Sequence, residues 1–151
     1  MNADQRRAGS PARRWLCKAW RMATTHAETH IARNADDVWN VFGDFQDLAS
    51  WFPGVEATPG ATDDVRLITM GPGVEITETL LSRDDANRTL TYKVEAAMLN
   101  ANKYETTIAV TENADGTSTA TMSAVLDPDA LADFIAPVYE GAIAGLAAHF
   151  A

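Results

Sequence analysis

Several features are scarce or missing in this 151-residue chain, and each absence excludes a class of protein. The single cysteine, Cys17, excludes an internal disulfide, so we expect a cytoplasmic protein kept in a reducing compartment. No apolar run approaches the roughly 20 residues that span a bilayer, and no integral membrane segment is expected. The chain also lacks GxSxG, HExxH, CxxC and phosphate-loop motifs, so no metal and no cofactor is expected.

Basic residues are few and unevenly placed. The formal net charge is -9, but residues 1–22 carry six basic side chains and one acidic one, whereas residues 23–151 carry six basic and 20 acidic ones. A body with a net charge of -14 repels phosphate backbones, so we expect no nucleic-acid partner. The length fits one domain, which we place at residues 23–151.

The basic segment, residues 1–22, has two interpretations. In the first, it is a disordered arm, or an upstream extension that is not translated because synthesis starts at Met22. In the second, it makes a weak contact with a membrane surface. The second interpretation rests on Trp15, Ala19 and Met22, which share one helical face among cations. The sequence does not specify an oligomeric state.

Apolar periodicity and turn residues predict an antiparallel sheet followed by a long helix. The alternating stretch at residues 25–32 predicts a first strand, and further strands are expected at residues 55–58, 65–70, 74–82, 89–96, 102–112 and 117–126. A meander must cover its apolar face, and the only long element available is the C-terminal helix. We therefore expect an α+β domain with a curved sheet wrapped around that helix.

Three helices are predicted. The first begins after Asn34 as its N-cap, and the second runs from about Phe45 to Trp51 and ends at Pro53. The C-terminal helix is expected to be capped by Asp127, with Pro128 in its first turn and a kink at Pro137. Its apolar stripe consists of Leu131, Phe134, Ile135, Val138, Ala142 and Leu146.

The facing surfaces carry residue types that suit a cavity. Ala142 and Gly145 on the helix either permit close backbone approach or leave space. Strand parity places Tyr92, Tyr104 and Met122 among aliphatic residues opposite the helix. Tyrosine hydroxyls in such a setting either point at a ligand or contact water at the rim of the sheet.

Glu78 is the candidate for chemistry. It shares its strand parity with Val74 and Ile76, so its carboxylate falls on an otherwise apolar face. A buried carboxylate has a raised pKa, which suits a general acid or base, or an anchor for the polar group of a ligand. The alternatives are a β-bulge that reverses the parity, or an ordinary salt bridge to Arg88 or Lys93.

Four stretches of the sequence resemble the polyketide cyclase/dehydrase-like branch of the START-like (SRPBCC) superfamily. They are DDVWNVFGDFQDLASWFPGV, ETLLSRDDANRTLTYKV, NKYETTIAVTENADGTSTATMSAVLDP and YEGAIAGL. The resemblance runs from about Thr24 to the C-terminus, and its most specific piece is the Trp-x-Pro of Trp51 and Pro53. Relatives often carry tryptophan where this chain has Met122, which suggests a wider or softer cavity wall.

The resemblance implies a helix-grip fold. In this fold a seven-stranded antiparallel sheet curls around the long C-terminal helix, and two short helices close one end. A cavity between sheet and helix holds lipids, polyketides, hormones or other apolar molecules. Because the branch contains carriers, receptors and a minority of cyclases and aromatases, the resemblance leaves the chemistry open.

These observations favour binding or transport of an apolar small molecule in an internal cavity. The alternatives are an enzyme of the polyketide cyclase/dehydratase type that uses Glu78 in acid-base catalysis, and a regulatory module whose loops at 71–73 and 98–101 recruit a protein partner. Phe45 and Phe52 are expected to fill the joint between helices and sheet, while Trp51 lines the cavity near its mouth. The expected ligand-binding residues are Trp51, Tyr92, Tyr104, Met122, Phe134, Val138 and Ala142.

Overall fold

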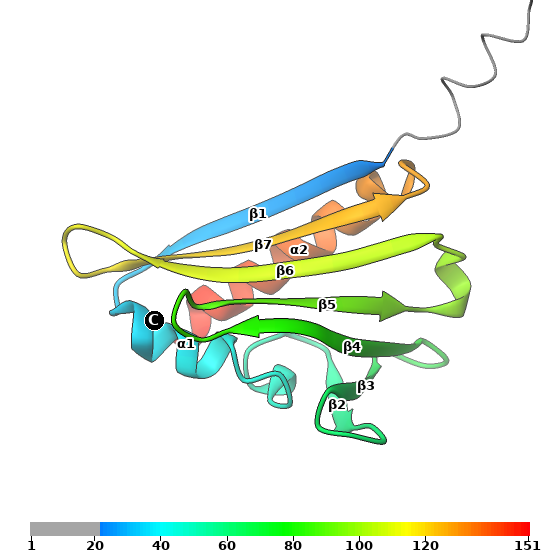
Figure 1. Ribbon diagram of the computed structural model, residues 1–151, viewed down its shortest axis with the longest axis horizontal. Coiled ribbons are helices and arrows are strands. Elements are labelled where there is room, and N and C mark those ends of the chain that lie inside the picture. Colours follow the sequence, from blue (N-terminus) through cyan, green and yellow to red (C-terminus); the bar gives the residue numbers. More distant parts are fainter. Residues whose placement is uncertain (1–21) are drawn as a thin grey trace, which may run out of the picture.

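The computed structural model describes residues 22–151 (Figure 1). The predictions made for the basic segment, including Cys17, lie outside the described residues. The strands are β1 (Ala23–Ile31), β2 (Glu56–Pro59), β3 (Val65–Thr69), β4 (Glu75–Asp84), β5 (Thr89–Glu95), β6 (Lys103–Glu112) and β7 (Ser118–Asp127). The helices are α1 (Ala35–Phe42), η2 (Leu48–Ser50), η3 (Ala97–Leu99) and α2 (Leu131–His149), of which η2 and η3 are single 3₁₀ turns.

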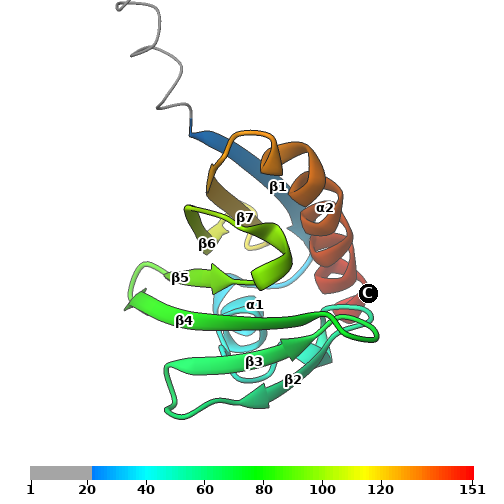
Figure 2. The ribbon, with the colours of Figure 1, turned by 90° about the vertical axis from the view of Figure 1, so that its right-hand side faces the viewer.

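The strands form one antiparallel sheet of seven strands in the order β1-β7-β6-β5-β4-β3-β2. Each strand pairs with its neighbour along the chain except β1, which returns to pair with β7. Along β6 and β7 buried residues alternate with less buried ones, because successive side chains point to opposite faces of a sheet. The sheet curls around α2, which lies along its concave side (Figures 1 and 2). The predicted helix-grip fold is confirmed.

The predicted start of α1 is confirmed at the level of single atoms. The side chain of Asn34 accepts a hydrogen bond from the backbone N–H of Asp37 at 2.9 Å, which satisfies one of the free donors of the first turn. Val38 and Phe42 then bury one face of the helix. The second predicted helix is shorter than expected, because η2 is only three residues long.

The predicted start of α2 is wrong. Asp127 is the last residue of β7, and the helix begins only at Leu131, with Ala130 at the N-cap position and no side-chain cap. The predicted apolar stripe is also displaced. Tyr139 and Ile143 are buried in addition to Ile135, Ala142 and Leu146, whereas Phe134 is 61% exposed. Pro137 lies inside the helix, as predicted.

By length and composition alone, α2 could cross a membrane. In this structure its buried side chains belong to the core of the domain, where the helix packs against β1 and β7. Such packing is typical of the core helix of a globular domain. Core helices of this kind can be as long and as apolar as a membrane-spanning helix.

The C-terminal half of α2 is in direct contact with the turn after η2. A Cβ atom built on Gly145 would lie 2.6 Å from the carbonyl oxygen of Trp51 and 2.7 Å from Cγ of Pro53. The ring of His149 also lies 3.2 Å from the carbonyl oxygen of Ser50. Glycine at position 145 is therefore what allows the two backbones to approach, which is one of the two outcomes expected for the small residues of this helix.

Candidate functional site

A cavity of about 270 Å³ lies between the concave face of the sheet and the N-terminal half of α2. The helix contributes Phe134, Ile135, Val138 and Tyr139 to its wall. The sheet contributes mainly aliphatic side chains of β3, β4 and β5, among them Ile68, Ile76 and Val94. The two halves of α2 thus differ. The C-terminal half contacts the turn after η2 directly, whereas the N-terminal half lines the cavity.

The mouth of the cavity is marked by the most exposed residues of its wall. Met98 of η3 is 58% exposed and Phe134 in the first turns of α2 is 61% exposed. Met70 and Val74, which flank the glycine-rich turn at 71–73, also line the cavity. The two loops that the regulatory hypothesis singled out therefore border the same opening.

Five of the seven predicted ligand-binding residues line this cavity: Tyr92, Tyr104, Met122, Phe134 and Val138. Trp51 and Ala142 do not. Ala142 is fully buried in the C-terminal half of α2, outside the cavity wall. Trp51 packs its ring against Phe42, with centroids 5.1 Å apart, in the joint between α1 and the η2 turn.

Of the three aromatic residues before the exposed Pro53-Gly54 turn, Phe45 lies between the helices and the sheet as predicted, whereas Trp51 and Phe52 have exchanged their predicted positions. Phe52, and not Trp51, reaches the cavity wall. Trp51 fills the joint where Phe52 was expected, with its ring 5.6 Å from that of Phe52. Phe45 is buried and packs beside Tyr92, with ring centroids 5.8 Å apart.

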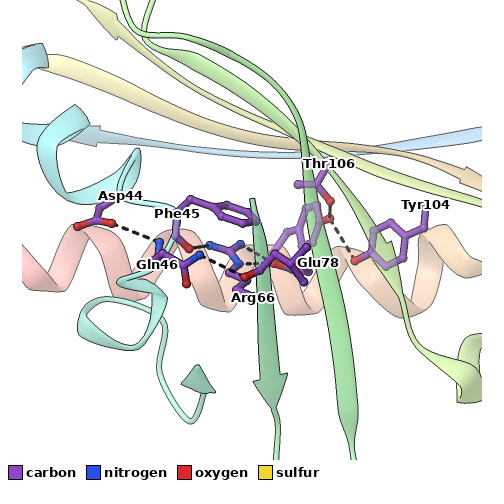
Figure 3. A network of polar contacts seen from close by, with 9 residues as sticks. Asp44, Phe45, Gln46, Arg66, Glu78, Tyr104 and Thr106 are labelled. Atoms are coloured by element: carbon purple, nitrogen blue, oxygen red, sulfur yellow. Dashed lines mark hydrogen bonds and ion pairs between the residues drawn. The ribbon is translucent and has the colours of Figure 1, made fainter. Parts of the chain in front are cut away.

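A buried ion pair between Arg66 and Glu78 forms the charged part of the cavity wall (Figure 3). The two residues are register partners on β3 and β4 and are 4% and 8% exposed. Nε of Arg66 donates to Oε2 of Glu78 at 2.6 Å, and Nη2 lies 2.5 Å from the same oxygen. Among residues 22–151 no hydrogen bond reaches Oε1 of Glu78, which is left available to the cavity that this residue lines.

Arg66 is held in place by contacts with Glu78, Phe45 and Tyr92. Its Nη1 donates to the carbonyl oxygen of Phe45 at 2.7 Å. Its Cζ lies 4.1 Å from the ring centroid of Phe45 and 4.8 Å from that of Tyr92, so the guanidinium contacts two neighbouring aromatic rings. These contacts fix the guanidinium and, through it, the carboxylate of Glu78.

The alternatives that the sequence left open for Glu78 are now decided. A β-bulge does occur in β4, but it lies between Leu80 and Ser82, beyond Glu78, and the parity of Glu78 is preserved. Neither predicted partner pairs with Glu78, because Arg88 pairs with Asp36 and Lys93 with Glu95. The carboxylate is in the cavity wall, as its parity predicted, and its cation comes from the neighbouring strand.

Burial raises the pKa of Glu78 above its ordinary value of 4.5, and the charge and hydrogen bonds of Arg66 oppose that rise. Two short contacts from one guanidinium stabilise the ionised form, so we assign Glu78 as a carboxylate at neutral pH. A carboxylate with a raised pKa and an unused oxygen is a hydrogen-bond acceptor and a weak base.

A chain of hydroxyl groups lies beside the ion pair. The hydroxyl of Tyr139 donates to that of Tyr104 at 3.1 Å and lies 2.5 Å from the hydroxyl of Thr106. Tyr92 is the register partner of Thr106 on the neighbouring strand. Burial raises the pKa of Tyr92, Tyr104 and Tyr139 above the ordinary tyrosine value of 10.0, so all three stay uncharged near neutral pH.

Replacing Tyr139 by phenylalanine is expected to lower the free energy of unfolding by about 1–3 kcal/mol, because the buried hydroxyls of Thr106 and Tyr104 lose their shared partner. Urea unfolding measures this loss. The control Thr107→Val removes a hydroxyl from the outer face of the sheet, where water replaces it, and should cost less than about 0.5 kcal/mol. Equal losses for the two variants would contradict a structural role for the hydroxyl chain.

Arg66 and Tyr139 were not predicted as site residues. Arg66 shares its strand parity with Ile68, which is buried, so assigning Ile68 to the core would have been the signal that places the guanidinium on the buried face. Tyr139 was left out because the predicted apolar stripe of the C-terminal helix was drawn through its sequence neighbour, Val138. Nε2 of His26 lies 3.4 Å from Oε2 of Glu28 on the exposed side of β1, away from the cavity.

The sequence matches a family model described as polyketide cyclase / dehydrase and lipid transport over residues 22–151. No curated protein matches the chain. The matched segment is the whole of the described structure, including every residue of the cavity wall.

Solved structures share the fold. An uncharacterised protein from Bacillus thuringiensis is 24% identical with a TM-score of 0.77, covering 85% of this chain and 98% of that one. The protein XoxI from Bacillus cereus is 24% identical with a TM-score of 0.78, covering 85% and 95%. The Zhui aromatase/cyclase from Streptomyces sp. R1128 is 15% identical with a TM-score of 0.68, covering 85% and 93%. At these identities the likeness concerns the fold alone.

Proposed function

The chain belongs to the polyketide cyclase/dehydrase and lipid-transport family, and from that premise we propose that it binds an apolar small molecule between its sheet and α2. The observation that carries the proposal is the cavity of about 270 Å³, whose wall is apolar except for the Arg66–Glu78 pair and the tyrosine hydroxyls. Apolar walls with a few polar groups are typical of small-molecule sites.

The cavity limits the size of its ligand. An engineered apolar cavity of roughly 150 Å³ takes up benzene. A cavity of about 270 Å³ therefore suits a molecule of about two fused rings, or a short aliphatic chain. Removing apolar surface from water supplies the affinity, at about 25 cal/mol for each Å² buried.

Replacing Val138 by phenylalanine is expected to fill the cavity, because Val138 lines it from α2 and is only partly buried. The affinity for 2-naphthol, measured by isothermal titration calorimetry, should fall by about tenfold or more, since part of the available volume is lost. The control Leu81→Phe adds the same ring at the bulged, half-exposed position of β4 and should leave the affinity unchanged. Equal affinities of wild type and Val138→Phe would contradict binding in this cavity.

A second candidate function, acid-base catalysis, is favoured by one specific observation. Glu78 has a raised pKa, an unused oxygen at the cavity wall and a guanidinium beside it. In this scheme the carboxylate removes a proton next to a carbonyl group of the substrate, and tyrosine hydroxyls stabilise the enolate oxygen. The Zhui protein, which shares the fold, is described as an aromatase/cyclase.

The variant Glu78→Gln separates the two functions. If the protein is an enzyme, the wild type should accelerate the aldol closure of a linear 1,5-diketone and the loss of one water that gives a cyclohexenone, and the variant should be about 100-fold slower. If it is a binding protein, wild type and variant leave the diketone equally unreacted. Absorbance of the cyclohexenone follows the reaction.

A further inference from the structure

The ionic residues of the cavity wall cancel one another. The wall contains one guanidinium, that of Arg66, and one carboxylate, that of Glu78, and they are in direct contact. The three tyrosines beside them are uncharged near neutral pH. The cavity as a whole is therefore electrically neutral.

Arg66 has little capacity to bind an anionic ligand. Its Nε and Nη2 face Oε2 of Glu78, its Nη1 donates to the carbonyl oxygen of Phe45, and its Cζ lies over the rings of Phe45 and Tyr92. Turning it toward a ligand anion would leave Glu78 charged and unpaired in an apolar wall. An unpaired buried charge is strongly unfavourable.

Within residues 22–151, the surroundings of the cavity add no further unpaired cation. Lys93 and Lys103, on the strands that flank η3, already pair with Glu95 and Glu105. The domain as a whole carries 20 acidic and six basic side chains. An anion therefore meets a negative field outside and a neutral, apolar wall inside.

Glu78 supplies one group that a ligand has to match. Both of its contacts with Arg66 use Oε2, and no hydrogen bond within residues 22–151 reaches Oε1. Ionised carboxylates form strong hydrogen bonds with neutral donors. A ligand with a hydroxyl or N–H group at its polar end would satisfy this oxygen without bringing a second charge into the cavity.

We infer that the cavity selects uncharged molecules that carry a hydrogen-bond donor and rejects carboxylate-bearing ones such as fatty acids, with Glu78 as the residue that sets this preference. The inference rests on the proposed binding function and adds the chemical class of the ligand to it.

Three probes of nearly equal size test the inference: 2-naphthol, naphthalene and 2-naphthoate. Titrated into the full chain at pH 7, 2-naphthol should bind about 100-fold or more tightly than 2-naphthoate, and about tenfold more tightly than naphthalene. In Glu78→Gln the positive charge of Arg66 is no longer cancelled, so the ratio of 2-naphthol to 2-naphthoate affinity should fall by about tenfold or more. A one-dimensional NMR spectrum shows whether the variant is folded. If the variant is unfolded, the ratio of 2-naphthol to 2-naphthoate affinity in the wild type decides the test by itself.

The other outcomes have distinct meanings. If 2-naphthoate binds the wild type as tightly as 2-naphthol, the inferred selectivity is wrong while the proposed binding function stands. If naphthalene binds as tightly as 2-naphthol, Glu78 does not recognise a hydrogen-bond donor on the ligand, and that part of the inference fails. If none of the three binds, the proposed function itself is overturned, and the inference with it.

Discussion

Replacing Arg66 by methionine should lower the free energy of unfolding at neutral pH by about 3–5 kcal/mol, the range expected when one partner of a buried ion pair is removed. Glu78 is 8% exposed, and Arg66 supplies both its side-chain hydrogen bond, from Nε, and its ion-pair contact, from Nη2. Urea unfolding of wild type and variant gives the difference directly. For a domain of this size the loss would be a large share of the total stability.

The loss should depend on pH in a defined direction. Burial already raises the pKa of Glu78 in the folded protein above 4.5, and removing Arg66 takes away the group that opposes this rise. A raised folded-state pKa contributes stability that is present below the unfolded value and is lost as pH rises through the folded value. The cost of Arg66→Met should therefore be smaller at pH 5 than at pH 8.

Two further variants separate the charge effect from simple loss of contacts. Arg66→Met combined with Glu78→Leu removes both charges, and its stability should return to within about 1 kcal/mol of the wild type or exceed it. Lys93→Met breaks the ion pair with Glu95, in which both side chains are about half exposed, and should cost no more than about 1 kcal/mol. A double variant as unstable as Arg66→Met would contradict the proposed origin of the penalty.

The second large effect is expected at Gly145. Alanine there would place Cβ 2.6 Å from the carbonyl oxygen of Trp51, and a backbone atom cannot move aside as a flexible side chain can. The helix and the turn after η2 would have to separate, which should lower the free energy of unfolding by about 1–3 kcal/mol. Thermal and urea unfolding both measure this change.

Gly141, one turn earlier in the same helix, is the matched control. A Cβ atom at that position meets no atom within 4 Å, so Gly141→Ala adds helix propensity without a clash. Its stability should rise by about 0.5–1 kcal/mol. If both variants were stabilised, the close approach of α2 to the Trp51–Pro53 turn would be wrong, and the cavity would no longer be confined to the N-terminal half of the helix.

Strand parity predicted much of the cavity wall from the sequence. It placed Tyr92, Tyr104 and Met122 on the buried face, because side chains of a strand alternate between faces whatever the rest of the fold does. It also placed Glu78 inward. The cation that pairs with Glu78, Arg66 on β3, was not predicted. Pairing across strands depends on register, which the sequence near Glu78 does not specify.

Other parts of the site depended on information that periodicity does not contain. On β3 the apolar Leu67 is 46% exposed and the charged Arg66 is 4% exposed, the reverse of what hydropathy predicts. The face of α2 could not be fixed either, because a stripe drawn through Phe134 and Val138 and one drawn through Ile135 and Tyr139 are both apolar. Which stripe is buried is decided by contact with β1 and β7.

The most direct test of the central claim, that a small molecule occupies the space between the sheet and α2, is an NMR measurement of intermolecular nuclear Overhauser effects. With 2-naphthol bound, its ring protons should show contacts to the methyl groups of Ile76 and Val138, which line the cavity. They should show none to Leu67 and Leu81, which are about half exposed and outside it. Contacts confined to those exposed leucines, or none to the cavity-lining methyl groups, would contradict the account.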